Sequence, residues 1–185
     1  MAAPNTKFVA AGKPKVTGGA LRAPLGTTLP TDSSGTLATG YVAQGYVGDG
    51  GLKQKPDIKV DKARAWGGQV VHVSQTEYGE TYSLTLICSR DKDVLETVYG
   101  DGNVAVGTDG GLVVRHTGDE RGASVWVFDM KAGRGRRIVV PNGSISDIGD
   151  ITYADKDVIG YALTIDALPD ESGVSSYEYL EGDAA

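Results

Sequence analysis

Residues 69–89 read QVVHVSQTEYGETYSLTLICS, and this stretch decides the fold. Its two ends, residues 69–74 and 81–89, are rich in β-branched and aromatic residues, which favour strands. Between them lies the polar sequence Glu-Tyr-Gly-Glu at 77–80, which predicts a turn and therefore a hairpin. In the second run apolar and hydroxyl side chains alternate, so one face of that strand is expected in the core. The predicted core face holds Tyr82, Leu84, Leu86 and Cys88.

One short helix is expected directly after this hairpin, over residues 91–99. Asp91 is a favourable N-cap, and Gly100 stands where a helix commonly ends. An apolar stripe lies between them at helical spacing, formed by Val94, Leu95, Val98 and Tyr99. About ten residues are too few for an isolated helix, so this helix must pack against sheets.

Other strand signals follow the same pattern along the chain and predict a mainly β fold. The expected class is two packed antiparallel sheets, a β-sandwich or partly closed barrel, flanked by one short α-helix. Extended N- and C-terminal arms and a long loop complete this expectation. A bulge is expected near Gly149, because the isoleucines before it fit neither strand nor helix spacing. The remaining predicted strands cover residues 41–47, 57–61, 112–116, 124–130, 137–140, 145–153 and 158–167.

Composition excludes several classes of protein. The chain has 185 residues, 40% of them hydrophobic, and a formal charge of −6, with no apolar run that approaches a membrane span. Cys88 is the single cysteine, so an internal disulfide is excluded. Neither His72 nor His116 has a second ligand at metal spacing, and no nucleophile or phosphate-loop motif occurs. We therefore expect no enzyme activity, no cofactor and no metal.

The two ends of the chain differ in charge, which predicts three regions. Residues 1–40 hold four basic side chains and one acidic one, and they carry four prolines. From Asp157 onward there are seven acidic side chains and no basic one. We divide the chain into an extended N-terminal arm (1–40), a β domain (41–168) and an acidic C-terminal arm (169–185). The arms are either flexible or become ordered on neighbouring subunits.

Several residues are candidates for contact with another subunit. The arm leucines Leu21, Leu25 and Leu29 have helical spacing, but the prolines beside them favour an extended segment that could add to a neighbouring sheet. Trp66 precedes two glycines and packs either in its own core or in a neighbour's pocket. A basic cluster suits a partner carboxylate better than nucleic acid, and it consists of Arg134, Arg136 and Arg137.

The order of features resembles the major tail tube proteins of long, non-contractile-tailed bacteriophages. The sequence VAAGKPKVTGGALRAPLGTTLPTD opens this order, and GYV, ARAWGG, the hairpin above and LETVYGDGNV follow. The resemblance runs from about Val9 to about Pro169. It implies a structural virion protein that forms hexameric rings, which stack into the tube through which DNA leaves the virion. It also implies a long loop that contacts the next ring, with residues 48–68 as the candidate.

The same resemblance implies partners and a location. These partners are further copies of the chain, a tape measure protein inside the tube, tail terminator and distal tail proteins at its ends, and passing DNA that is not bound specifically. The protein would be assembled in the host cytoplasm and reside in the virion tail, with no membrane binding. Glu77 and Glu80 are chosen as acidic residues facing the lumen, where negative charge would repel phosphate. The alternative is a β-sandwich binding module, such as a capsid decoration or carbohydrate-binding domain.

Overall fold

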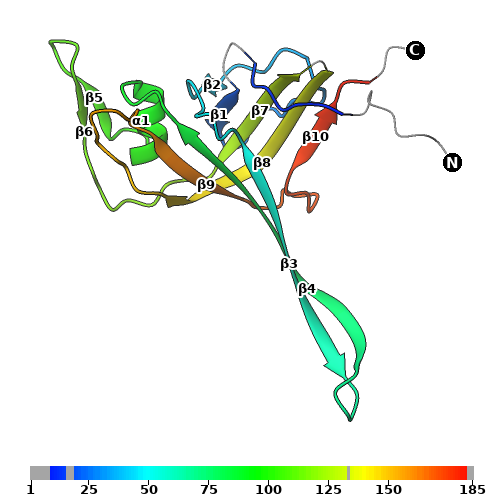
Figure 1. Cartoon of the computed structure of the whole chain (residues 1–185). Helices are drawn as coiled ribbons and strands as arrows, with labels where there is room; N and C mark the ends of the chain where they lie inside the picture. The colour runs from blue at the N-terminus through cyan, green and yellow to red at the C-terminus, as the bar shows by residue number, and fades with distance from the viewer. Residues whose placement is uncertain (1–8, 16–18, 133, 183–185) are drawn as a thin grey trace.

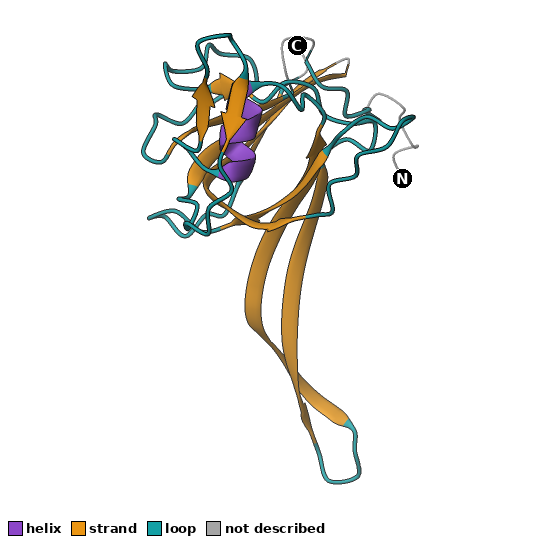
Figure 2. Cartoon of the chain, turned by 90° about the vertical axis from the view of Figure 1, so that its left-hand side faces the viewer, coloured by secondary structure: helices purple, strands orange, loops and turns teal. Residues whose placement is uncertain are grey.

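The predicted mainly β class with one short helix is confirmed (Figures 1 and 2). The computed structural model describes residues 9–15, 19–132 and 134–182, except for the side chains of residues 132 and 134. The elements are β1 (Ala20–Pro24), β2 (Val42–Ala43), β3 (Lys53–Arg64), β4 (Val70–Leu86), α1 (Lys92–Tyr99), β5 (Val104–Val106), β6 (Leu112–Val114), β7 (Ser124–Ala132), β8 (Arg134–Ile148), β9 (Tyr161–Ala167) and β10 (Tyr177–Leu180).

Eight of the strands form one large antiparallel sheet. Its order is β2-β1-β7-β8-β9-β4-β3, and β10 pairs with the first part of β8. Strands β5 and β6 form a separate two-stranded sheet. Neither sheet closes on itself, so the large sheet keeps β2 at one edge and β3 at the other.

The large sheet bends at β8, and this bend creates two layers. The first part of β8 pairs with β7 and β10, and its last residues pair with β9. The pairing with β7 shifts register opposite Pro141, where a proline is tolerated because a bulge leaves its position without a ladder hydrogen bond. The bend brings Tyr82 of β4 to 5.7 Å from Phe128 of β7, between ring centroids, and Trp126 stacks on Phe128 at 6.2 Å. This aromatic stack is the centre of the core.

Helix α1 covers one end of this core as its sequence pattern predicts. The Asp91 carboxylate accepts a hydrogen bond from the backbone N–H of Asp93, and Gly100 ends the helix with φ of 101°. The apolar stripe of the helix belongs to the same buried cluster as the aromatic stack and the inner side chains of β4 and β9, and Tyr99 meets Tyr161 of β9 edge to face. The helix spans Lys92–Tyr99 with Asp91 as its cap, which confirms the prediction for residues 91–99.

The outer face of β7 and β8 is covered by the N-terminal segment and held by a buried ion pair. The Arg137 guanidinium donates to both Asp129 carboxylate oxygens, at 2.6 and 2.9 Å, and to the carbonyl oxygens of Asp32 and Gly35. Lys15 contacts the same Asp129 carboxylate at 2.8 Å. Within the expected N-terminal arm, β1 pairs with β7 of its own chain. Part of the arm sequence therefore belongs to the main sheet.

Several expected strand boundaries were wrong. Residues 69–74 and 81–89 are not two arms of a hairpin: β4 runs without a break through residues 77–80, and it pairs with β3 or β9 from Val70 to Leu86 except at residues 71 and 76. The expected loop 48–68 contains β3, and the true turn lies at residues 65–69. The stretches 137–140 and 145–148 belong to the single strand β8, whose bulge falls between Ile145 and Asp147 rather than near Gly149.

The buried ion pair predicts a large effect on stability. Replacement of Asp129 by asparagine removes the nearest counter-charge of the buried Arg137 guanidinium and leaves it with Asp32 at 3.7 Å, which should lower the free energy of unfolding by about 3–5 kcal/mol. Chemical denaturation measures this change. The matched control is Arg136→Gln, which removes a half-exposed pair with Glu178 and should cost less than about 1 kcal/mol. Equal effects of the two changes would contradict the structural role of Asp129.

The same pair predicts sensitivity to acid. Burial alone raises the pKa of Asp129, but hydrogen bonds and charges from Arg137 and Lys15 outweigh it and hold that pKa below its usual value. Stability from the ionised carboxylate is therefore complete above the unfolded pKa of about 3.9 and is lost as pH falls below it, through the folded pKa. The difference in unfolding free energy between wild type and Asp129→Asn should shrink over that range. A constant difference down to the lowest pH would argue against this assignment.

Candidate assembly surface

The β3–β4 hairpin leaves the body of the protein and ends far from it (Figures 1 and 2). Every residue of β3 is exposed, and so are residues 70–78 of β4. The two strands pair from Lys53 to Arg64, which satisfies backbone groups between them. An isolated two-stranded hairpin is at best marginally stable in water. Its length outside the body therefore indicates that another surface supports it.

The hairpin carries apolar side chains that its own chain does not cover. Ile58 is 55% exposed, and it lies directly opposite Tyr78, which is equally exposed. Exposed apolar residues on neighbouring positions mark contact surfaces more often than isolated ones do. The exposed apolar residues on the two strands of this hairpin, which we call the hairpin surface, are Ile58, Val60, Val70, Val71, Val73 and Tyr78.

The tip of the hairpin presents Trp66 to solvent. Ala65 and Gln69 close the turn with a backbone hydrogen bond of 2.8 Å, and Gly68 donates back to Ala65 at 2.9 Å. Gly67 and Gly68 have φ of 107° and 90°, a region that other residues rarely adopt. Trp66 is fully exposed, so it is not packed in the core of its own chain. Its role as an interface anchor stays a prediction.

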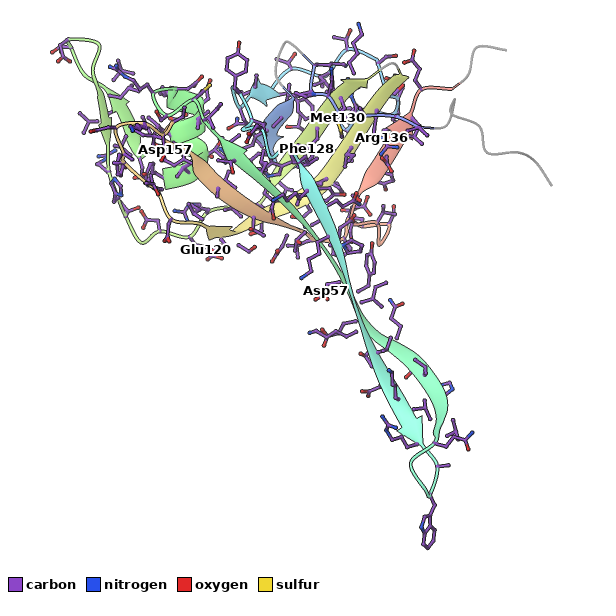
Figure 3. The ribbon with its side chains drawn as sticks, viewed as in Figure 1. Asp57, Glu120, Phe128, Met130, Arg136 and Asp157 are labelled. Carbon is purple, nitrogen blue, oxygen red and sulfur yellow. The ribbon has the colours of Figure 1, made fainter. Side chains whose placement is uncertain are left out.

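The root of the hairpin is fixed by a buried polar cluster. The Glu80 carboxylate accepts hydrogen bonds from the Tyr82 hydroxyl at 2.9 Å and the Ser176 hydroxyl at 2.8 Å, and a third from the Gln54 amide. Ser176 precedes β10, so this cluster joins β3, β4 and the C-terminal segment. The cluster holds the hairpin in one direction where it leaves the body (Asp57 in Figure 3).

The choice of Glu80 as a lumen residue was wrong. Glu80 is only 5% exposed, and its carboxylate accepts hydrogen bonds from Gln54, Tyr82 and Ser176 at the hairpin root. Glu77 is exposed, but it forms an ion pair with Lys59 on the neighbouring strand. These two glutamates therefore occupy different environments, and neither presents an isolated negative charge.

The predicted basic cluster does not act as one unit. Arg137 is 1% exposed and binds Asp129, so it is not available to a neighbouring subunit. Arg136 pairs with Glu178 of its own C-terminal segment at 3.1 Å. The partner is a carboxylate, as expected, but it belongs to the same chain. The side chain of Arg134 lies outside the described residues. Only Arg136 remains on the surface as a described candidate.

The arm leucines are separated by the fold. Leu21 lies in β1 and pairs with Val127 on one side and Ala43 on the other. Leu25 is exposed just beyond the end of β1, and Leu29 is partly buried in the following loop. These leucines therefore do not lie on a helix in spite of their helical spacing, as the neighbouring prolines predict.

A second surface is formed by the outward face of β4, β9 and the end of β8. Directly paired residues share a face, and here Ser83 lies opposite Thr164 while Thr81 and Ser144 both lie opposite Asp166. Lys53 and Lys55 of β3 border this face, beside Asp57. Its side chains are small and polar. We call it the hydroxyl face, and it consists of Thr81, Ser83, Thr85, Ser144, Ser146, Asp147, Ala162, Thr164 and Asp166.

Sequence reasoning missed the hairpin because it placed the turn twelve residues too late. The signal that could have located it is the sequence Trp66-Gly67-Gly68, which favours a turn. This sequence lies between two β-rich runs that carry a charged or polar residue at every second or third position. The hydroxyl face was partly visible in the alternation of residues 81–85. Its continuation on β8 and β9 depends on long-range pairing.

Comparison with known proteins agrees with an assembly subunit. The family model described as phage tail tube protein matches residues 1–185, the whole chain. No curated protein matches the chain. Among the residues that the structure describes, no helix has the length and hydrophobicity that a membrane crossing needs. The family consists of structural proteins of the virion, and the match covers both the hairpin and the sheet that carries it. This chain belongs to the phage tail tube protein family.

Proposed function

We propose that copies of this chain associate into hexameric rings, that these rings stack into the tail tube, and that the tube conducts DNA into the host cell. The observation that carries the proposal is the β3–β4 hairpin, whose apolar surface is exposed along its full length outside the body. A neighbouring subunit provides the missing cover. The number of six copies comes from the resemblance to tail tube proteins.

The open edges of the large sheet support association in one direction. Among the described strands, none pairs with the outer edge of β3, and β2 at the opposite edge is only two residues long. Unpaired strand edges favour pairing with another chain. Contact between two different surfaces of identical subunits produces rings when the rotation closes. The two edges are suited to such head-to-tail contacts.

The hydroxyl face is the surface we assign to the lumen. Its serine and threonine side chains neither stack on bases nor present large apolar groups, and the face and its border together carry three carboxylates, of Asp57, Asp147 and Asp166, against two lysines. Such a surface has little attraction for phosphate. Glu77 is the weaker lumen candidate, because its charge is paired with Lys59. The net charge of −6 per chain, repeated around a ring, adds repulsion.

The remaining partners follow from this architecture. A tape measure protein would occupy the lumen during assembly in the host cytoplasm, and terminator and distal tail proteins would cover the free ring faces at the two ends. Exposed strand edges at the ends of a finite tube need such cover. Co-purification of tubes with these proteins from infected cells tests this set of partners.

Removal of the hairpin should abolish assembly without unfolding the body. Asp57 and Gly79 are directly paired, so a two-residue Asn-Gly turn can replace residues 58–78. The shortened protein should keep its circular dichroism and thermal midpoint, because the deleted residues are exposed. Electron microscopy should then show stacked rings of constant diameter for the full chain and none for the shortened one. Tubes formed by the shortened protein would refute the role of the hairpin.

Positive charge on the hydroxyl face should slow DNA passage. In phage carrying Ser83→Lys and Thr164→Lys together, tubes should assemble normally but eject DNA more slowly, because each ring then binds phosphates. Higher salt should restore the rate. The control pair is Ser83→Gln with Thr164→Gln, which adds similar length without charge. Ejection that is equally fast with lysine and glutamine would place this face outside the lumen.

A further inference from the structure

Two adjoining cavities form a continuous groove between β1, α1 and the loop before β7. One has a volume of about 340 Å³ and the other about 260 Å³, and they share Arg22, Glu96 and Asp101. Pro24, Leu25 and Val42 form an apolar wall in the larger cavity, and Leu25 and Val42 are exposed in the chain. We call this the β1–α1 groove. It has the volume and the apolar wall that a large aromatic side chain requires.

The floor of the groove contains a buried donor that lacks an acceptor. Trp126 is 0% exposed and lines the smaller cavity, and its Nε1–H has no hydrogen-bond partner among the described residues. Its Nε1 edge lies against Gly143, which lines the same cavity. A buried polar group without a partner costs free energy, so an acceptor that enters the groove is favoured. Backbone carbonyl oxygens of a glycine-rich turn are suitable acceptors.

The charge of the groove identifies the type of occupant. Five carboxylates and two guanidinium groups line its two cavities, and Figure 3 shows Glu120 on the body of the protein. Arg22 holds Asp101 through two contacts of 2.9 Å, and Lys92 pairs with Glu96 at 2.7 Å, so the acidic rim consists of Asp93, Asp119 and Glu120. Lys62 and Arg64 occupy alternate positions just before the turn of the hairpin. A basic turn is therefore attracted to the groove.

We propose that the hairpin tip of one copy docks in the β1–α1 groove of another copy, with Trp66 against the Leu25 and Val42 wall. The inference rests on the proposed tube, and it names the receiving surface. Within one chain the tip points away from the body (Figure 1), so only a second copy can supply it. The hairpin extends from β3 at one edge of the sheet, and the groove borders β1 and β2 at the other. Such a contact is head-to-tail and propagates through identical subunits.

Two other pairings are less favourable. The acidic C-terminal arm would be repelled by the carboxylates of the groove. A cavity of about 380 Å³ near Tyr99, Tyr153 and His116 could accept an aromatic ring, but it is lined by Arg90 and contains no carboxylate. A basic tip gains no charge pairing there. This second cavity serves as the internal control.

Loss of the indole tests the anchor. Trp66→Ala should raise the protein concentration needed for tube formation roughly thirty-fold, the effect expected when a buried interface anchor is removed. The control is Tyr153→Ala, which removes an exposed aromatic ring next to the second cavity and should leave that concentration unchanged. Light scattering and electron microscopy measure it. An unchanged threshold for Trp66→Ala overturns the inference.

Disulfide trapping tests the receiving surface directly. In a Cys88→Ala background, protein with Ala65→Cys is mixed with protein carrying Ala123→Cys, which lies in the groove, or Tyr153→Cys, which lies in the second cavity and is exposed. Oxidation should cross-link the first mixture and not the second. Both variants of each mixture must show the thermal midpoint of the parent protein.

The outcomes separate the inference from the proposed function. If tubes form without the 65–123 cross-link, another segment covers the groove. The docking inference is then wrong, but the proposed tube function is still supported. Cross-linking of the second mixture alone moves the tip to the cavity near Tyr153 and also overturns the inference. If the unmodified protein forms no tube under any condition, the proposed function itself is contradicted.

Discussion

Backbone pairing between β3 and β4 is the interaction on which the rest of the structure depends. These strands continue their hydrogen-bond ladder well beyond the body, so the hairpin satisfies its backbone without burying its side chains. A ladder alone does not stabilise such an extension in water. The polar cluster around Glu80 joins the hairpin to the C-terminal segment and sets its direction. The molecule thus presents an apolar surface that only another molecule can cover.

The body is built to hold this extension rigidly. Its sheet bends at Pro141, and the bend stacks Trp126, Phe128 and Tyr82 into one aromatic column. Behind the column, Arg137 and Asp129 tie the N-terminal segment to the outer face of β7 and β8. Both faces of these strands are therefore buried, and the faces left open belong to β4, β9 and the edges of the sheet. Interior stability and assembly surfaces occupy separate parts of the chain.

The charges of the body and those of the groove are arranged differently. Charged residues inside the body are paired with one another, whereas the groove beside β1 keeps an acidic rim and a buried indole N–H without an acceptor. Such features are costly in an isolated subunit and become favourable when a partner fills them. The proposed docking would pair the basic hairpin tip with the acidic rim of this groove.

The sequence by itself determined the local elements whose signals lie within a few residues. The Asp91 cap and the apolar stripe predict helix α1. The strict alternation of apolar and hydroxyl side chains predicts the inner face of residues 82–86. Tertiary structure alone decided that β4 passes straight through residues 77–80, because pairing with β3 along this stretch, and with β9 from Thr81 onward, outweighs the turn preference of Gly79. It also decided that Glu80 and Arg137 are buried while Trp66 is exposed. Burial depends on residues brought together from distant segments, and no local pattern encodes it.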